Sequence, residues 1–252
     1  ILKRPWDRMA KSIFVEHLKI EGVVAKQFSG LNITEEDVKA AMRQLQLSSN
    51  AMDWSGQDLR NFASELRKTT KPMLIAANKA DLPTAKENIE RLKKEFPNYL
   101  VVGCSAEAEL ALKEAHRLGL ISYLSGDSEF EVIDENKLSR QQLNALKLIK
   151  DKVLDIYGGS GVQGVLNSAV FELLRLLAVF PVPNSKLIDQ HGNILPDCHL
   201  VKQGTTALEF AFKLHTDFGK NFIRAVDIRK GFAVGKEHKL QHRDVVEVVA
   251  AK

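Results

Sequence analysis

Apolar residues recur at helical spacing through the first seventy residues. Those in residues 5–30 predict one long helix, which Gly30 can close. Thr34 and Ser55 each stand three residues before an Asp, the spacing of a capping box, and predict the starts of two further helices. The third helix carries one clean apolar face, made of Leu59, Phe62, Ala63 and Leu66. We therefore expect a helical subdomain over residues 1–70.

The pattern then changes to short continuous apolar runs. Met73 to Ala77 and Tyr99 to Gly103 have the length of strands that are buried on both faces of a parallel sheet. Between them, Thr84 and Glu87 have capping-box spacing and predict a helix that ends before Pro97. Strand, helix and strand form a βαβ crossover, which brings the carboxyl ends of both strands to one edge of the sheet.

Helical spacing returns after the second strand. The last predicted helix runs through Leu177, and Pro181 and Pro183 end it and mark a domain boundary. We therefore expect a second domain over residues 71–182. One further helix is expected over residues 107–118. Capping boxes at Ser139 with Gln142 and at Ser160 with Gln163 predict the starts of two more.

In the remaining residues, 183–252, the pattern changes again to short apolar segments that are typical of strands. Two short apolar segments flank residues 190–193 and predict a hairpin turn, and a capping box at Thr206 predicts a helix. Strands are expected over 222–228 and 245–250. One helix among strands in so short a segment indicates a β-grasp-like domain. The predicted helix face consists of Leu208, Ala211, Phe212 and His215, with His215 half-buried.

Composition is that of an ordinary soluble globular protein, with 44% hydrophobic and 27% charged residues among 252. The two cysteines, Cys104 and Cys198, have neither metal-site nor disulfide spacing, which fits a reducing cytoplasm. No apolar run has the length of a membrane span and no secretory signal is visible, so we expect a cytoplasmic protein without a membrane partner. No histidine has the partners of a metal site, and the sequence leaves the oligomeric state open.

Polar side chains follow the first predicted strand, where ligands of open α/β sheets bind. They form the motif Asn78-Lys79-Ala80-Asp81, which resembles the base-reading motif of GTP-binding proteins. Guanine presents two neighbouring N–H donors that the Asp81 carboxylate could accept together, and adenine offers no such pair. The stem of Lys79 would cover the base, and Asn78 would tie the loop to its neighbours. The alternative is a polar turn, since such a motif arises by chance in roughly 3% of chains of this size.

Ser105 and Ala106 follow the second predicted strand, one crossover later. The two motifs together resemble the base-reading half of GTP-binding proteins. The resemblance implies that the Ser105-Ala106 backbone donates to the guanine carbonyl and that Ser105 supports Asp81. It also implies an α/β fold, the C-terminal half of a Rossmann-like P-loop GTPase domain with a helical insertion.

The phosphate-binding half of such a domain has no counterpart in the sequence. The motif Gly-x-x-x-x-Gly-Lys-Ser/Thr is absent, and Gly158-Gly159 and Gly161 have no following Lys. The chain does not begin with Met. We therefore expect the phosphate and Mg²⁺ ligands upstream of Ile1, and no catalytic residue within the chain itself.

The C-terminal segments 196–206, 211–219 and 242–249 resemble a TGS domain, a β-grasp module. With the helical insertion and the base motifs, the order of parts is similar to the Obg-related YchF-like GTPases, especially the archaeal type. Bacterial and eukaryotic members of that group with an altered base motif favour ATP. Because Lys79 and Asp81 are intact here, the resemblance implies GTP as the ligand.

Two functions remain open at this point. The first is a GTPase of the Obg-YchF type, of which this chain would be the C-terminal part. The chain by itself is expected to be inactive. The second is an RNA- or ribosome-binding module that acts through the TGS domain. From residue 184 onward there are 11 Lys/Arg and 8 Asp/Glu, so 11 − 8 = +3 of the formal net charge of +4 lies there. A solvated charged face is an equally good explanation of this excess.

Overall fold

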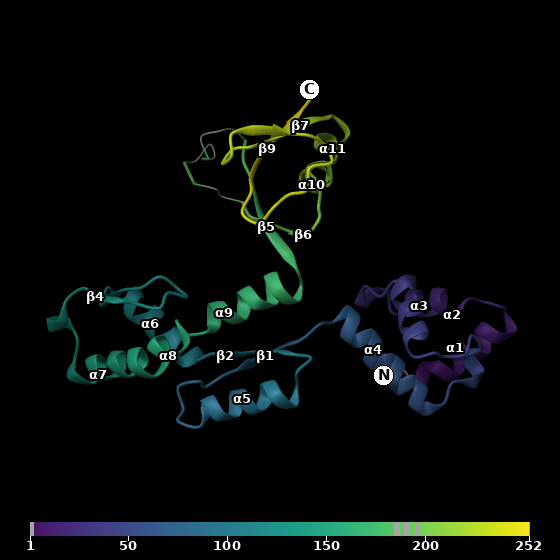
Figure 1. Cartoon of the computed structure of the whole chain (residues 1–252), viewed down its shortest axis with the longest axis horizontal. Coiled ribbons are helices and arrows are strands. Elements are labelled where there is room, and N and C mark those ends of the chain that lie inside the picture. Colours follow the sequence, from purple (N-terminus) through teal and green to yellow (C-terminus); the bar gives the residue numbers. More distant parts are fainter. Residues whose placement is uncertain (1–2, 184–186, 189–191, 195–196, 252) are drawn as a thin grey trace. The chain divides into compact units, whose positions relative to one another are not determined.

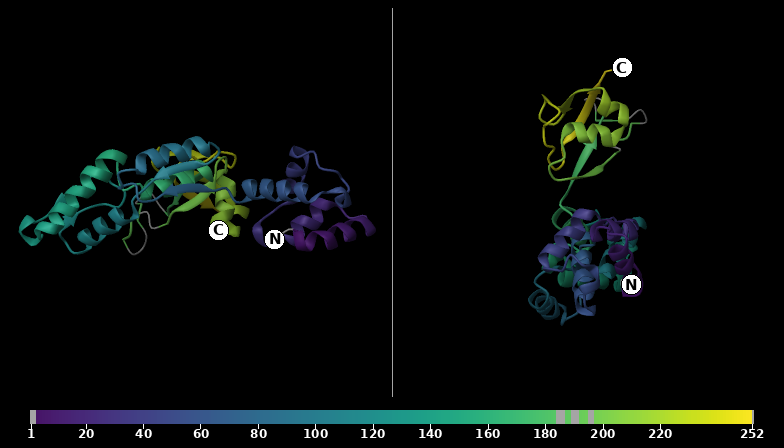
Figure 2. Two further views of the ribbon diagram at one scale, coloured as in Figure 1. Left: turned by 90° about the horizontal axis from the view of Figure 1, so that it is seen from below. Right: turned by 90° about the vertical axis from the view of Figure 1, so that its right-hand side faces the viewer.

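A computed structural model describes residues 3–183, 187–188, 192–194 and 197–251 (Figure 1). Its internal contacts divide the chain into two compact units, Ile1–Leu74 and Ile75–Lys252. The first unit is helical (Figures 1 and 2). Its elements are α1 (Lys3–Val15), α2 (Ile20–Gln27), η1 (Ser29–Leu31), α3 (Glu35–Gln44), η2 (Ala51–Asp53) and α4 (Gly56–Thr70).

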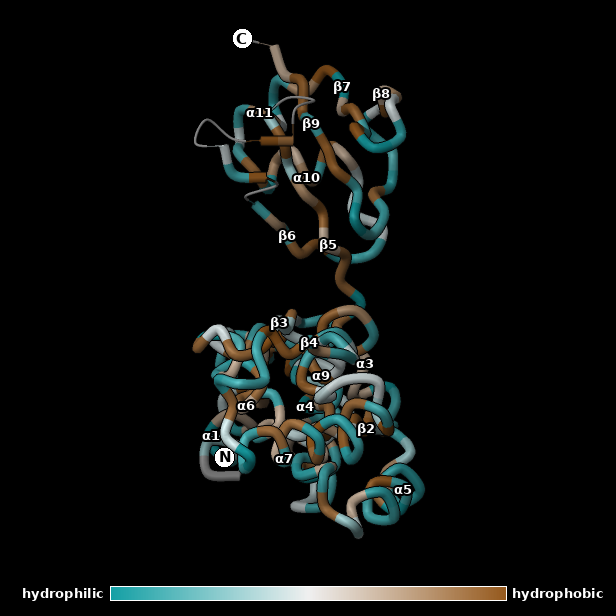
Figure 3. Tube along the Cα trace, turned by 90° about the vertical axis from the view of Figure 1, so that its left-hand side faces the viewer, coloured by the Kyte–Doolittle hydropathy of each residue, from teal (hydrophilic) through white to brown (hydrophobic). Residues whose placement is uncertain are grey.

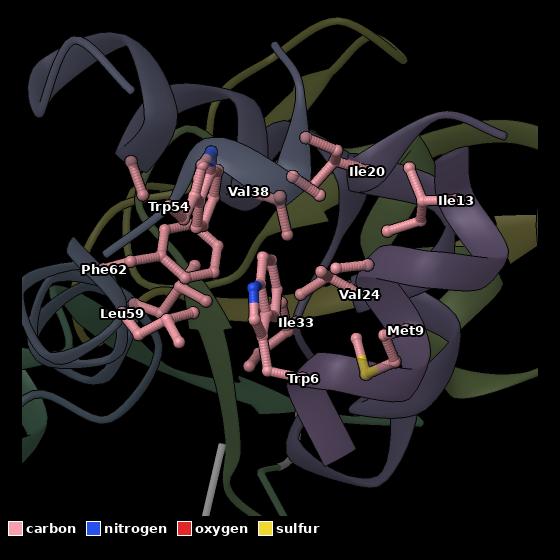
Figure 4. Close-up of a cluster of buried hydrophobic side chains, with 14 residues drawn as sticks. Trp6, Met9, Ile13, Ile20, Val24, Ile33, Val38, Trp54, Leu59 and Phe62 are labelled. Atoms are coloured by element: carbon pink, nitrogen blue, oxygen red, sulfur yellow. The ribbon is translucent and has the colours of Figure 1, made fainter. Parts of the chain in front are cut away.

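Aromatic side chains form the centre of the first unit (Figure 4). The rings of Trp6 and Trp54 are stacked with centroids 4.7 Å apart, and Phe62 meets Trp54 edge-on at 4.9 Å. The indole N–H of Trp54 donates to the carbonyl of Ser48 at 2.8 Å, so the buried ring has its polar group paired. The apolar face predicted for α4 supplies Leu59, Phe62 and Leu66 to this core.

The predicted single helix over residues 5–30 is wrong, because α1 ends at Val15 and α2 begins at Ile20. His17 adopts a left-handed backbone with φ of 53°, and the amide of Leu18 bonds back to the carbonyl of Ile13 at 3.0 Å. This is the geometry that closes a helix, and the apolar spacing alone gives no sign of it. The predicted capping boxes at Thr34 and Ser55 are confirmed.

The predicted crossover starts at the boundary between the two units and consists of β1 (Leu74–Ala77), α5 (Ala85–Glu95) and β2 (Leu100–Gly103). It is followed by α6 (Ala106–Arg117). β1 and β2 form a two-stranded sheet, and α5 and α9 (Val162–Asn167) both contact β2 (Figure 1). The expectation of strands buried on both faces is wrong, since no residue of either strand is fully buried. Within the described residues each strand pairs only with the other, so neither is flanked by strands on both sides.

The elements that follow α6 pack against it around Leu112, Ile121, Leu146 and Leu154. Gly158, with φ of 70°, ends the helical run. The elements are β3 (Ile121–Ser122), β4 (Glu131–Val132), η3 (Glu135–Lys137), α7 (Arg140–Ile149), the π-helix η4 (Lys150–Leu154), α8 (Asp155–Tyr157), α9 and the π-helix η5 (Ser168–Leu173).

The capping boxes of this region have different outcomes. The box at Ser139 is confirmed. Thr84 precedes α5 but makes no side-chain cap, because its backbone (φ −89°, ψ −1°) is already helical rather than extended. The box at Ser160 is wrong too: Gly161 is the N-cap of α9, and the Ser160 hydroxyl donates to Glu109.

The C-terminal part of the second unit contains a five-stranded sheet in the order β6-β5-β9-β7-β8. β5 and β9 pair in parallel and both appear largely apolar in Figure 3. The predicted helix through Leu177 is wrong, because Leu177 and Pro181 lie in β5, after Arg175 with φ of 50°. The elements are β5 (Leu176–Pro181), β6 (His199–Lys202), α10 (Ala207–Leu214), α11 (Thr216–Lys220), β7 (Phe222–Asp227), β8 (Phe232–Val234) and β9 (Val245–Ala250).

The helix α10 begins at the predicted capping box of Thr206, but its buried face differs from the prediction. Ala207, Phe210 and Ala211 are its buried residues, whereas Phe212 is exposed. His215 follows the helix with 63% of its side chain exposed, so its expected half-burial is wrong. Ile188 and Ile194 form an antiparallel bridge, as a hairpin requires, and residues 190–191 of the predicted turn lie outside the described residues.

Among the described residues, every helix is too short or too polar to cross a bilayer.

Candidate functional site

The loops that follow β1 and β2 are joined by backbone hydrogen bonds. The amide of Cys104 donates to the carbonyl of Ala77 at 3.0 Å, and the amide of Ala80 donates to the carbonyl of Cys104 at 3.0 Å. The ladder of the two strands thus continues past their ends into both predicted base-reading motifs. Cys104 is buried between them, and its burial raises the pKa of the thiol, which suits a packing residue.

A side-chain hydrogen bond joins Asp81 to Ser105. The Ser105 hydroxyl donates to Asp81 Oδ1 at 2.8 Å, although the two residues are 24 positions apart. The same hydroxyl accepts from the amide of Ala108 at 3.3 Å and caps α6. Ser105 is 2% exposed while Asp81 is exposed, so a buried group orients a carboxylate that faces outward.

Asn78 ties the first loop to the second. Its Oδ1 accepts from the amide of Ala106 at 3.0 Å and from the amide of Lys79 at 2.8 Å. Lys79 has a left-handed backbone with φ of 64°, a conformation with an energetic cost for a residue that carries a Cβ. The amide of Ser105 donates to the carbonyl of Ser160 at 2.8 Å. Both backbone N–H groups expected to face guanine therefore have protein partners in this structure.

Two hollows adjoin the loops. Asp81 and Ser105 line one of about 450 Å³, which lies between α6 and the α7–η4 segment and includes Leu148 and Lys152 in its wall. Asn78 and Lys79 line another of about 250 Å³ beside α5. The structure thus brings all five predicted residues into one pair of loops, with Asp81 and Lys79 opening to different hollows.

Sequence reasoning missed residues that hold these loops from behind. Tyr157 donates its hydroxyl to the carbonyl of Ala80 at 3.2 Å. The buried Glu109 accepts from Ser160 at 2.6 Å and from Tyr123 at 2.8 Å. Burial, together with the hydrogen bond to Glu109, raises the pKa of Tyr123 to about 12, so its hydroxyl remains a donor. The glycines around Ser160 were the only sequence signal of a tight turn at this place.

Two protein-family models match the part of the chain that contains these loops and the sheet that follows them. Residues 76–184 match the model of the G4 motif-containing domain of the Obg-like GTPase YGR210-like family, and residues 179–250 match the TGS domain. The chain thus contains the G4 motif-containing domain of an Obg-like GTPase, followed by a TGS domain. The predicted α/β fold class, with the later part of a GTPase domain followed by a β-grasp TGS domain, is confirmed.

Individual relatives agree with these two family matches. It is 47% identical over 252 residues to the uncharacterized GTP-binding protein MJ1332 of Methanocaldococcus jannaschii, covering all of this chain and 63% of that protein. It is 30% identical over 215 residues to the uncharacterized GTP-binding protein C428.15 of Schizosaccharomyces pombe, covering 82% of this chain and 52% of that protein. The chain therefore spans about one half to two thirds of these relatives.

Among solved structures, the fold is similar to that of a GTP binding protein from Pyrococcus horikoshii OT3. The TM-score is 0.74 with 41% sequence identity, covering 99% of this chain and 66% of that one.

Proposed function

We propose that the protein binds guanine nucleotide and that Asn78, Lys79, Asp81, Ser105 and Ala106 read the base. The observation that carries this proposal is the 2.8 Å hydrogen bond from Ser105 to Asp81. It fixes a carboxylate at the end of a strand, where ligands of α/β sheets bind. The names of the relatives, which describe GTP-binding proteins, support the same ligand.

The carboxylate has the capacity for this role. Each carboxylate oxygen has two acceptor positions, so Asp81 Oδ1 can hold Ser105 and still accept from a base. Asp81 would accept the ring N–H and the exocyclic amine of guanine together. The amide of Ala106 would give up its hydrogen bond to Asn78 Oδ1 and donate to the guanine carbonyl instead. This change needs a rotation of the Asn78 side chain and no movement of the strands.

We further propose that the full-length protein hydrolyses GTP with Mg²⁺. Because the sequence lacks the phosphate loop Gly-x-x-x-x-Gly-Lys-Ser/Thr, we assign the Mg²⁺ and phosphate ligands to another part of that protein. Within the chain, we assign residues 1–70 to a helical insertion and residues 71–175 to the G domain with its following helices. Residues 176–252 are assigned to the TGS domain, because β5 pairs with β6 and β9 of its sheet. A cytoplasmic location fits this function.

Exchange of Asp81 for Asn in the full-length protein tests the base assignment. An amide replaces one acceptor oxygen with a donor, which opposes the guanine amine and favours the second carbonyl of xanthine. We expect affinity for GDP to fall and affinity for xanthosine diphosphate to rise, as measured by calorimetry. Asp7→Asn, an exposed change in α1, is the matched control. An Asp81→Asn protein that keeps the affinity of the parent for GDP would refute the assignment.

A second candidate function is RNA or ribosome binding by the TGS domain, favoured by its net charge of +3, from 11 − 8. Not every cation can serve it. Lys230 Nζ lies 2.9 Å from Asp227 Oδ2 and 3.0 Å from Asp244 Oδ1, and both carboxylates are buried, so Lys230 has a structural role. Lys236 and Lys239 are exposed in the segment between β8 and β9.

Reversal of these two lysines tests the second function. The double variant Lys236→Glu and Lys239→Glu should weaken co-sedimentation with ribosomes and reduce its dependence on salt, because phosphate contacts release counterions. GDP affinity should remain that of the parent. The pair Lys11→Glu and Lys39→Glu, which changes the charge equally in the helical unit, is the control. Equal co-sedimentation of both variants with the parent would show that the lysines only face solvent.

A further inference from the structure

The turn of residues 157–161 contacts both candidate base-reading loops, and neither the sequence motifs nor the family matches assign it a role. Tyr157 donates its hydroxyl to the carbonyl of Ala80 in the first loop at 3.2 Å. The carbonyl of Ser160 accepts the amide of Ser105 in the second loop at 2.8 Å. One turn therefore holds both loops, although it follows them by many residues.

The contact to the first loop is made at the residue that separates the two base-reading side chains. Ala80 lies between Lys79 and Asp81, and it is 4% exposed. Its amide donates to the carbonyl of Cys104 at 3.0 Å, while its carbonyl accepts from Tyr157. Both peptide groups of Ala80 are thus fixed. The directions in which the flanking Lys79 and Asp81 side chains leave the loop depend on those two hydrogen bonds.

The turn is itself held rigidly. The Ser160 hydroxyl donates to the buried carboxylate of Glu109 at 2.6 Å, and Tyr123 donates to the same oxygen at 2.8 Å. Gly161 has φ of 79°, and a Cβ there would lie 2.1 Å from the carbonyl oxygen of Gly103. Only glycine permits this close approach of the turn to the end of β2. A buried hydrogen-bonded network with all members paired rigidifies its surroundings.

We propose that Tyr157 and Ser160 are positioning residues for guanine, acting through Ala80 and Ser105 on the orientation of Asp81. This inference rests on the proposed function of Asp81. A bidentate contact requires both carboxylate oxygens to be in line with both donors of the base, whereas a single hydrogen bond tolerates a rotation of the carboxylate. Loss of the turn's contacts should therefore cost guanine more than hypoxanthine, which lacks the exocyclic amine.

Tyr157→Phe in the full-length protein is the first test, because it removes the hydroxyl and keeps the ring. Affinities for GDP and inosine diphosphate are measured by calorimetry, with thermal unfolding alongside. We expect the ratio of the two affinities to narrow by about three- to tenfold, the effect of one hydrogen bond. Tyr99→Phe, at the opposite end of β2, is the matched control and should leave the ratio unchanged. A purely structural role would weaken both nucleotides equally or lower only the unfolding temperature.

Ser160→Ala provides a second test: it keeps the carbonyl that accepts from Ser105 but removes the hydroxyl bond to Glu109 that anchors the turn. Ser168→Ala is its control, since Ser168 bonds only the exposed Glu172 among the hydrogen bonds described for its side chain. The ratio should narrow in the first variant and not in the second. An unchanged ratio in both Tyr157→Phe and Ser160→Ala would overturn the inference. Asp81→Asn, measured in parallel, separates the base-reading role of Asp81 from the positioning role of the turn. If Asp81→Asn changes the preference to xanthosine diphosphate while both turn variants keep the affinity ratio of the parent, only the positioning role is refuted.

Discussion

Ser105→Ala separates the support of the base-reading carboxylate from ordinary helix capping. The change removes the donor to Asp81 Oδ1 and the acceptor for the amide of Ala108, while the backbone bond from Ser105 to Ser160 remains. A hydrogen bond to a charged group contributes about 1.5–3 kcal/mol. Because the Asp81 end is exposed, we take about 1–1.5 kcal/mol, which corresponds to a loss of GDP affinity of about 5- to 12-fold.

The assay is GDP calorimetry on the full-length protein, with thermal unfolding as a second readout. Loss of an N-cap lowers the stability of a protein by about 0.5–2 kcal/mol. Ser139→Ala is the matched control, because Ser139 caps α7 with an exposed capping box. Both variants should show reduced stability, and only Ser105→Ala should bind GDP more weakly. Equal GDP affinity in the two variants would refute the view that Ser105 orients Asp81 for the base.

Three further outcomes are expected. The chain of residues 1–252 alone should release no phosphate from GTP above the buffer rate, as measured by a phosphate assay, because its sequence lacks the phosphate loop Gly-x-x-x-x-Gly-Lys-Ser/Thr. Phe62→Ala should lower the free energy of unfolding of the helical unit by about 3–5 kcal/mol, measured by urea titration, since Phe62 is fully buried. Lys230→Met should lower the midpoint of thermal unfolding. Burial raises the pKa of Asp227, but the hydrogen bonds and charge of Lys230 outweigh this effect and hold that pKa below its usual value. The stabilisation is therefore present above the usual pKa of an aspartate and is lost as the pH falls through the lowered pKa.

The sequence by itself determined the features that depend on neighbouring residues. The capping boxes at Thr34, Ser55, Ser139 and Thr206 form because each needs only a side chain and an amide three positions away. The crossover of β1, α5 and β2 is equally local, and its geometry brings the end of β1 to the end of β2. The proximity of Asp81 and Ser105 followed from that topology, although their function in binding guanine stays a prediction.

Tertiary structure decided the features in which distant groups compete for the same atoms. Ser160 has the spacing of a capping residue, but the buried carboxylate of Glu109 takes its hydroxyl. Leu177 has helical spacing, but pairing with β6 makes its segment a strand, since sheet partners lie far along the chain. Lys230 looks like any surface cation until Asp227 and Asp244 meet at its amine. A sequence pattern records what a residue can do locally, and the free energy of burying a distant polar group determines which option is used.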